Sequence, residues 1–228
     1  MRRVLIVSAV AVGAAVAMLA GYAPMSEVQA QADKPEQVET AIFAGGCFWC
    51  VESDFDHVPG VFDTISGYTG GHLDNPTYRD VVSETTGHRE AVQISYDPEK
   101  VSYETLLDVF FRSVDPTDKH GQFCDRGESY TTAIYTLDDA QAEQARTASI
   151  EAGQVLGREI ATVIEPASMF YPAEDYHQNY YQKNPIRYAG YRLGCRRDRR
   201  VKDLWGEQAH RGIVKDLSLI HISEPTRQ

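Results

Sequence analysis

The residues best suited to chemistry in this chain lie in the segment Gly-Gly-Cys-Phe-Trp-Cys, residues 45–50. Cys47 follows a predicted strand and two glycines, and it begins a predicted helix that ends before Pro59. The first backbone N–H groups of a helix lack partners within the helix, so they and the helix dipole favour an anion there. We therefore expect the Cys47 thiol to ionise readily and to act as a nucleophile, with the glycines leaving its sulfur accessible. A buried, inert cysteine or half of a structural disulfide is the alternative.

Cys50 completes a C-x-x-C pair with Cys47, a spacing found in redox couples and in half of a zinc site. A structural zinc site would need two more ligands at suitable spacing. Cys124 and Cys195 are isolated in the sequence, and no H-x-x-x-H pattern accompanies them. We therefore expect no metal site.

One carboxyl group and several aromatic side chains could assist a reactive thiol. Glu90 lies at the start of a predicted strand, and a carboxyl group near an apolar pocket can have a raised pKa and act as a general acid. A solvated surface glutamate is the alternative. Phe48 and Trp49 suit either the core or a small pocket that holds a substrate's methyl group. Four further candidates are unremarkable when each is taken alone: Tyr78, Asp125, Tyr130 and His177.

Predicted strands and helices alternate along the chain. The strands are expected over residues 38–44, 62–68, 89–96, 130–137 and 159–164. The helices are expected over residues 47–57, 102–114, 138–156 and 174–183. This alternation predicts a single domain of the α/β or α+β class. With 228 residues, of which 43% are hydrophobic, the chain can bury one sizeable core.

The two ends of the chain are not expected to belong to this domain. Residues 1–30 combine two arginines, an apolar run and small residues before a cleavage-like position, which is typical of a signal peptide. We therefore expect an exported protein, periplasmic or secreted, with an uncleaved anchor as the alternative. Residues 31–39 are polar and are predicted to be a linker, residues 40–206 the domain, and residues 207–228 a tail. Its last eleven residues follow no periodic pattern and are interpreted as vector or adapter sequence.

The charge balance argues against nucleic acid as a partner. The chain has 33 acidic residues and 22 Lys or Arg, which gives a net charge of −11. An acidic protein is a poor general binder of nucleic acid or anionic lipid. The basic cluster within residues 192–202 has no groove-reading element beside it, and we expect it to form a solvated face.

The motifs of residues 40–206 resemble those of A-type peptide methionine sulfoxide reductases. The segments that carry the resemblance occur in the family's order, at residues 46–49 with 51–52, 59–61, 67–71, 75–78, 86–88 with 90–92, 96–98, 125–127 with 130, 133–135, 170–171 and 177–178. So many ordered matches are far more specific than a lone C-x-x-C. The resemblance implies a two-layer sandwich around a central mixed β-sheet.

The resemblance also implies roles for the candidate residues. Cys47 would attack the sulfur of the S epimer of methionine sulfoxide, and Glu90 would give a proton to the sulfoxide oxygen. The other roles implied are hydrogen bonding of that oxygen by Tyr78 and Tyr130, help in orienting the polar side by Asp125, and substrate binding by Phe48, Trp49 and His177. Methionine then leaves and Cys47 becomes a sulfenic acid. A second thiol converts it to a disulfide, which a thioredoxin-like donor reduces, and no metal or organic cofactor is implied. We expect a monomer.

The resolving thiol is left open by the sequence. Many relatives have glycine in place of Cys50, and many carry the resolving cysteine in a glycine-rich C-terminal tail. We favour Cys195, because a mobile tail can fold over the site. Cys50 ranks second, provided that helical geometry allows the bond, and Cys124 ranks third.

Two other functions compete with sulfoxide reduction. A thioredoxin-like disulfide oxidoreductase would use Cys47 and Cys50 as its pair, and its substrates would be protein dithiols. It leaves Glu90 and the ordered motifs unexplained. A non-enzymatic alternative is an exported binding module with structural disulfides, which predicts no titratable thiol in the oxidised protein.

Overall fold

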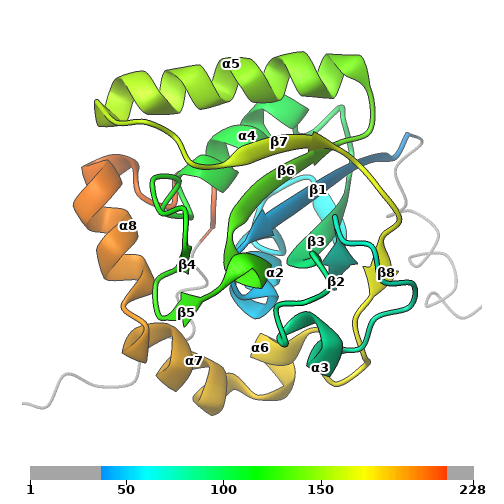
Figure 1. Ribbon diagram of the computed structural model, residues 1–228. Coiled ribbons are helices and arrows are strands. Elements are labelled where there is room, and N and C mark those ends of the chain that lie inside the picture. Colours follow the sequence, from blue (N-terminus) through cyan, green and yellow to red (C-terminus); the bar gives the residue numbers. More distant parts are fainter. Residues whose placement is uncertain (1–36, 215–228) are drawn as a thin grey trace, which may run out of the picture. The chain divides into compact units, whose positions relative to one another are not determined.

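The computed structural model of the protein describes residues 37–214 (Figure 1). The predicted signal peptide, most of the predicted linker and the atypical last eleven residues lie outside the described residues. Within residues 37–214, none of the helices has the length and apolar composition that would let it cross a membrane.

The centre of the fold is a six-stranded mixed sheet with strand order β7-β6-β1-β3-β2-β8. Its strands are β1 (Glu39–Gly45), β2 (Val61–Thr69), β3 (Arg89–Tyr96), β6 (Thr132–Thr136), β7 (Val163–Pro166) and β8 (Tyr171–Pro172). All neighbouring strands are antiparallel except β6 and β7, which are parallel. The predicted mixed sheet is therefore confirmed. Two short strands, β4 (Gly121–Gln122) and β5 (Asp125–Arg126), form a separate hairpin that the sequence analysis did not predict.

The helices expected over residues 47–57, 102–114 and 138–156 are present, whereas the short helix at residues 78–81 was not predicted. The helices of the structure are α2 (Phe48–Phe55), α3 (Tyr78–Val81), α4 (Tyr103–Phe111), α5 (Asp139–Leu156), α6 (Tyr180–Lys183), α7 (Pro185–Gly194) and α8 (Arg197–Trp205), with single turns of 3-10 helix at Glu128–Tyr130 and Gly206–Gln208. The Asp138 side chain caps α5 by accepting a hydrogen bond from the Gln141 N–H at 2.8 Å. The sequence predicts this capping pair, because Asp138 begins the helix expected over residues 138–156 and Gln141 follows it by three residues.

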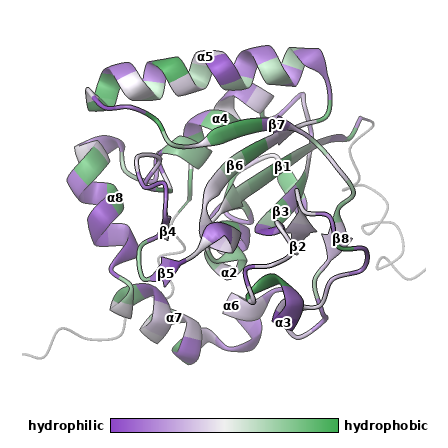
Figure 2. Ribbon diagram, in the orientation of Figure 1, coloured by the Kyte–Doolittle hydropathy of each residue, from purple (hydrophilic) through white to green (hydrophobic). Residues whose placement is uncertain are grey.

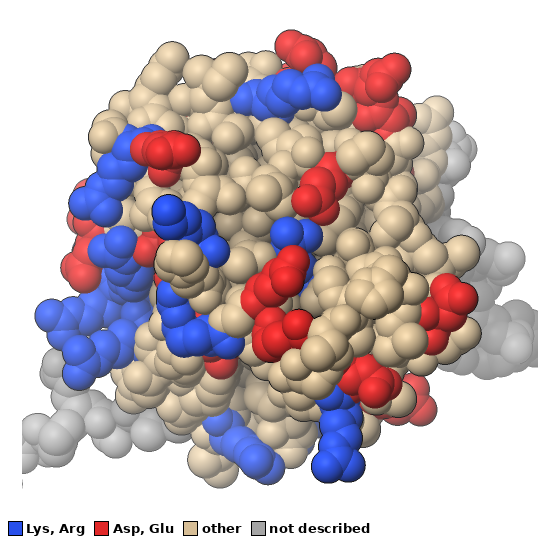
Figure 3. Space-filling model, in the orientation of Figure 1, with Lys and Arg blue, Asp and Glu red and all other residues tan. Residues whose placement is uncertain are grey.

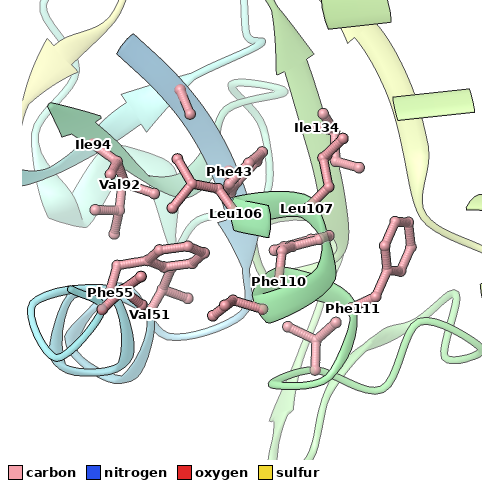
Figure 4. Close-up of a cluster of buried hydrophobic side chains, with 14 of the residues drawn as sticks. Phe43, Val51, Phe55, Val92, Ile94, Leu106, Leu107, Phe110, Phe111 and Ile134 are labelled. Atoms are coloured by element: carbon pink, nitrogen blue, oxygen red, sulfur yellow. The ribbon is translucent and has the colours of Figure 1, made fainter. Parts of the chain in front are cut away.

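The main core lies on one face of the sheet (Figure 4). Phe43 of β1 packs between two helices, with ring centroids 5.4 Å from Phe55 of α2 and 5.0 Å from Phe110 of α4. Alternate residues of a strand point to opposite faces, so Ile42 of β1 belongs to a second, smaller cluster on the other face. That cluster is covered by the segment around Phe170 rather than by a helix. Helices on one face of a mixed sheet make the predicted two-layer sandwich, and hydrophobic residues are accordingly concentrated in its central strands (Figure 2).

The C-terminal segment differs from the prediction. A mobile tail was predicted around Cys195, but the structure contains α7 and α8 on either side of that residue. Pro185 occupies the first turn of α7, where its missing N–H costs nothing, so it begins a helix as well as ending the previous one.

The basic cluster is only in part the solvated face that was expected: Arg196, Arg199 and Lys202 are exposed, but other members are not. Lys and Arg side chains do gather over α8 at the left of Figure 3, but acidic residues lie among them. Arg197 is 2% exposed, and the Arg192 side chain is 14% exposed and paired with Asp54 of α2. The prediction failed for these two arginines because their partner carboxylate is far away in the sequence and close only in the folded chain.

Candidate active site

Cys47 lies where β1 ends, at the N-cap of α2. The preceding Gly46 has a φ of +79°, and a Cβ at that position would lie 2.5 Å from the side chain of Gln122. Only glycine combines this backbone conformation with this close approach. The local sequence therefore places the sulfur at the start of the helix, as predicted.

The accessibility and ionisation expected for Cys47 are both wrong. Cys47 is 7% exposed, and its thiol contacts the Cys50 thiol and the Tyr191 hydroxyl. Burial raises the pKa of Cys47 well above its ordinary value, and the neighbouring Cys50 and Glu90 raise it further. The first N–H of α2, that of Phe48, donates to Glu90 Oε2 at 2.9 Å instead of stabilising the Cys47 sulfur.

The pKa values of the two thiols are shifted in opposite directions. The hydrogen bond from the Cys47 thiol lowers the pKa of Cys50 to about 7, against the effect of burial and with help from Arg197 and Arg192. Of the two thiols, Cys50 is therefore the one that ionises more readily. Cys50 is also in position to accept the proton when Cys47 attacks an electrophile.

Glu90 has the environment of a general acid. It lies in β3, is 2% exposed, and pairs across the sheet with Tyr68 of β2. Burial raises the pKa of its carboxyl to about 8, an effect partly offset by the hydrogen bond from Phe48 N–H. The group is therefore mostly protonated at neutral pH, close to the Cys47 thiol.

Two predicted tyrosines meet at Glu90. Tyr78 begins α3, and its backbone N–H is held by Glu174 Oε1 at 2.9 Å. The Tyr130 hydroxyl lies close to both the Tyr78 hydroxyl and the Glu90 carboxyl group. Burial raises the pKa of both tyrosines, so both retain their protons and can donate to an oxygen.

Aromatic rings form one wall of the site. The Phe48 ring lies 5.9 Å from Tyr68 and 4.9 Å from His177, centroid to centroid. Trp49 Nε1 donates to His177 Nδ1 at 3.0 Å, and its ring stacks on Tyr180 with centroids 3.7 Å apart. Burial lowers the pKa of His177, so its imidazole is neutral and accepts this hydrogen bond.

Asp125 faces the site through a residue that the sequence analysis did not single out. Asp125 accepts a hydrogen bond from the Tyr191 hydroxyl, which also lies against Cys47. Tyr191 comes from α7, so the C-terminal helix closes this side of the site. Tyr191 belongs to no local pattern that could have revealed its place. Glu174 accepts hydrogen bonds from the Tyr68 hydroxyl at 2.8 Å and the Tyr78 N–H at 2.9 Å, which is the structural role that its place in the sequence predicts.

The four cysteines form two pairs. Cys124 and Cys195 are joined by a disulfide with Cα atoms 4.9 Å apart, while Cys47 and Cys50 are free and buried. Cys124, Asp125 and Cys195 offer ligand atoms within 4.8 Å of one another, but the two sulfurs are bonded together and neither is a thiolate that a metal could use. Of the three resolving candidates, only Cys50 contacts Cys47 through its side chain in this state.

Comparison with known sequences agrees with the motifs. A family model described as peptide methionine sulfoxide reductase matches residues 39–209. Peptide methionine sulfoxide reductase MsrA 2 of Rhizobium meliloti is 58% identical over 173 residues, which cover 76% of this chain and 86% of that protein. The protein of the same name from Caulobacter vibrioides is 50% identical over 207 residues, covering 90% of this chain and 100% of that protein.

Solved structures show the same fold. Methionine sulfoxide reductase A of Corynebacterium diphtheriae superposes with a TM-score of 0.63 and 36% identity, over 66% of this chain and 77% of that chain. Mxr1 from Saccharomyces cerevisiae in its reduced form gives a TM-score of 0.62 and 33% identity, over 67% of this chain and 88% of that chain. The buried thiol pair, the protonated carboxyl group and these matches lead to one conclusion: the chain belongs to the peptide methionine sulfoxide reductase family and is an oxidoreductase.

Proposed function

We propose that this enzyme reduces the S epimer of methionine sulfoxide, free or in oxidised proteins, to methionine. The observation that carries the proposal is the buried, protonated Glu90 beside the Cys47 thiol at the start of α2. A sulfoxide is a poor electrophile until its oxygen receives a proton, so a thiol alone does not suffice. A neutral carboxylic acid close to the thiol supplies that proton.

The first half of the reaction uses the groups around Glu90. The substrate's methyl group packs against Phe48 and Trp49, and its oxygen accepts hydrogen bonds from Tyr78 and Tyr130. Cys47 attacks the sulfur as its proton passes to Cys50 and Glu90 protonates the oxygen. The attack forms an S–S bond to the substrate sulfur, which now carries a hydroxyl group. The hydroxyl then moves to the Cys47 sulfur as this S–S bond and the substrate S–O bond break, which leaves methionine and a sulfenic acid on Cys47. The substrate gains two electrons and the Cys47 sulfur loses two.

We propose Cys50 as the thiol that resolves this sulfenic acid, ahead of Cys195. The Cys50 side chain lies against Cys47, whereas Cys195 is bonded to Cys124. Its low pKa keeps much of Cys50 in the reactive thiolate form at neutral pH. A thioredoxin-like dithiol then reduces the Cys47–Cys50 disulfide and returns the enzyme to its starting state.

The proposed reaction is tested with matched epimers. Purified enzyme and a dithiol reductant should convert a peptide with the S epimer of methionine sulfoxide to the methionine peptide, as measured by chromatography. The R epimer is the control and should not react, because its oxygen would point away from Glu90. Reduction of protein disulfides with no reaction of either epimer would favour the thioredoxin-like alternative instead.

The resolving thiol is identified by a single turnover without reductant. The fully reduced enzyme is given one equivalent of sulfoxide, and its disulfides are mapped by mass spectrometry. We expect a Cys47–Cys50 bond, and we expect the same bond in Cys195→Ser. A bond from Cys47 to Cys195 in the wild-type enzyme would contradict the assignment of Cys50.

We also propose that the enzyme works outside the cytoplasm. The support is the signal-like composition of residues 1–30 and the Cys124–Cys195 disulfide, a bond that persists in oxidising compartments. The N-terminal sequence of protein recovered from an exported fraction tests this, and a chain that retains Met1 in the cytoplasm would contradict it.

A further inference from the structure

A cluster of buried charges lies beneath the thiol pair. Asp54 follows Cys50 by four residues in α2, so the two side chains lie on the same face of the helix. Arg192 of α7 reaches Asp54 Oδ1 with Nη1 at 2.8 Å and also pairs with Asp198 at 2.7 Å. Arg197 of α8 approaches Asp54 Oδ2 with Nε at 3.8 Å. Two helices from the end of the chain thus bring cations to the helix that carries both free thiols.

Arg197 spans the first turn of α2. Its Nη1 donates to the carbonyl oxygen of Gly45, just before Cys47, at 3.1 Å, while its Nε faces Asp54. The guanidinium therefore lies between the residue that precedes Gly46 and Cys47 and the second turn of α2. Its outer face rests on the Phe123 ring, with the central carbon 4.7 Å from the ring centroid.

The charge of Arg197 is incompletely satisfied by its neighbours. Arg197 is 2% exposed, yet its Nε and Nη2 have no hydrogen-bond partner among the described residues. A guanidinium has five donors, and leaving them unpaired in a buried site is costly. An anion near it lowers that cost: the Asp54 carboxylate lies 3.8 Å from Nε, and the charge of Arg197 also favours the ionised form of Cys50.

We infer that Arg197, with Arg192, is a positioning residue that holds Cys50 as a thiolate against Cys47. The inference rests on the proposed function for its catalytic meaning. The Cys50 thiolate attacks the sulfur of the Cys47 sulfenic acid, the S–S bond forms as the S–O bond breaks, and hydroxide takes a proton to leave as water. The arginines do not take part in bond making. They set the fraction of Cys50 that is in the thiolate form and can therefore attack.

The corner that carries both arginines is fixed by the second cysteine pair. Cys195 caps the end of α7, α8 begins at Arg197, and the disulfide joins Cys195 to Cys124 in the β4–β5 connection. This crosslink holds the α7–α8 corner against the domain. The disulfide thereby keeps Arg192 and Arg197 at their positions near the Cys47–Cys50 pair.

The test isolates Cys50 as a single thiol. In Cys47→Ser with the Cys124–Cys195 disulfide intact, Cys50 is the one free cysteine, and the serine hydroxyl still donates to it. The ultraviolet absorbance of the thiolate is followed against pH, with the Cys47→Ser, Cys50→Ser double variant as the blank. The ionisable groups around Cys50 are residue 47, Asp54, Glu90, Tyr188, Tyr191, Arg192 and Arg197.

Adding Arg197→Met should raise the midpoint of this titration by about one pH unit or more, as loss of a nearby opposite charge does. Arg197→Lys, which keeps the charge, should restore most of the shift. Arg199→Met, an exposed arginine of the same helix, is the matched control and should leave the midpoint unchanged. An unchanged midpoint in a folded Arg197→Met protein would overturn the inference.

A second substitution guards against a folding defect at Arg197. Asp54→Asn removes the carboxylate that opposes ionisation of Cys50, so it should lower the midpoint. If the charge cluster were purely structural, Arg197→Met and Asp54→Asn would shift the midpoint of the Cys50 titration in the same direction. An upward shift in Asp54→Asn would therefore overturn the inference. Sulfoxide reduction by the wild-type enzyme is measured in a separate experiment. If that enzyme were inactive while the titrations gave the expected shifts, the proposed function would be refuted and the role of Arg197 would stand.

Discussion

Replacing Cys47 by serine should abolish methionine formation, with a loss of at least about 10³-fold in the first-turnover rate. A serine hydroxyl holds its proton far more tightly than a thiol. Its oxygen also cannot take up the sulfoxide oxygen, whereas the cysteine sulfur does so when it becomes a sulfenic acid. The substitution replaces one polarisable sulfur atom by oxygen in a buried site, and the other contacts of the site remain. Quenched-flow measurement of methionine released from a sulfoxide peptide gives the rate.

Cys50→Ser provides the contrast. This variant should still release close to one methionine per enzyme, but it should fail to recycle, because the sulfenic acid on Cys47 has lost its partner. A trapping reagent specific for sulfenic acids should then label Cys47. Retention of repeated turnover by Cys47→Ser would show that another thiol is the nucleophile.

Glu90→Gln should slow the first turnover by roughly 10²- to 10³-fold, the usual range for a lost general acid. Glutamine keeps the size of the side chain and can still accept the hydrogen bond from Phe48 N–H. It cannot transfer a proton to the sulfoxide oxygen. Glu39→Gln, at the opposite end of β1 from Cys47, is the matched control and should leave the rate unchanged.

The pH dependence provides an independent signature of Glu90. The acid form is the active one, and the pKa of the carboxyl is about 8. Below this pH the carboxyl retains its proton and the reaction proceeds. As the pH rises through about 8 the proton is lost and the wild-type rate should fall. Glu90→Gln should lack this descending limb, and a limb that persisted in the variant would assign the proton to another group.

Local patterns predicted most of the scaffold and the position of the nucleophile. Alternation of apolar residues identified β1 and β3, and capping identified the start of α5, because these signals act over a few residues. The double glycine before Cys47 predicted a thiol at the start of a helix for the same reason. These features depend on backbone geometry that is encoded within a short segment.

The C-terminal helices and the charges of the site could not be predicted in this way. Arg192 and Arg197 looked solvated because Asp54, their partner, lies far away in the sequence. Tyr191 gave no signal, although it contacts Cys47 and Asp125. Burial and pairing depend on residues brought together from distant segments, and no local pattern records them.

The sequence by itself determined that Cys47 and Cys50 share the first turn of a helix and that Glu90 begins a strand. The tertiary structure decided which of the two thiols bears the charge. The helix start alone favours ionisation of Cys47, but Glu90 takes the first helical N–H and two arginines lie beside Cys50. An ionisation equilibrium responds to every charge within a few ångströms, and only the folded chain sets those distances.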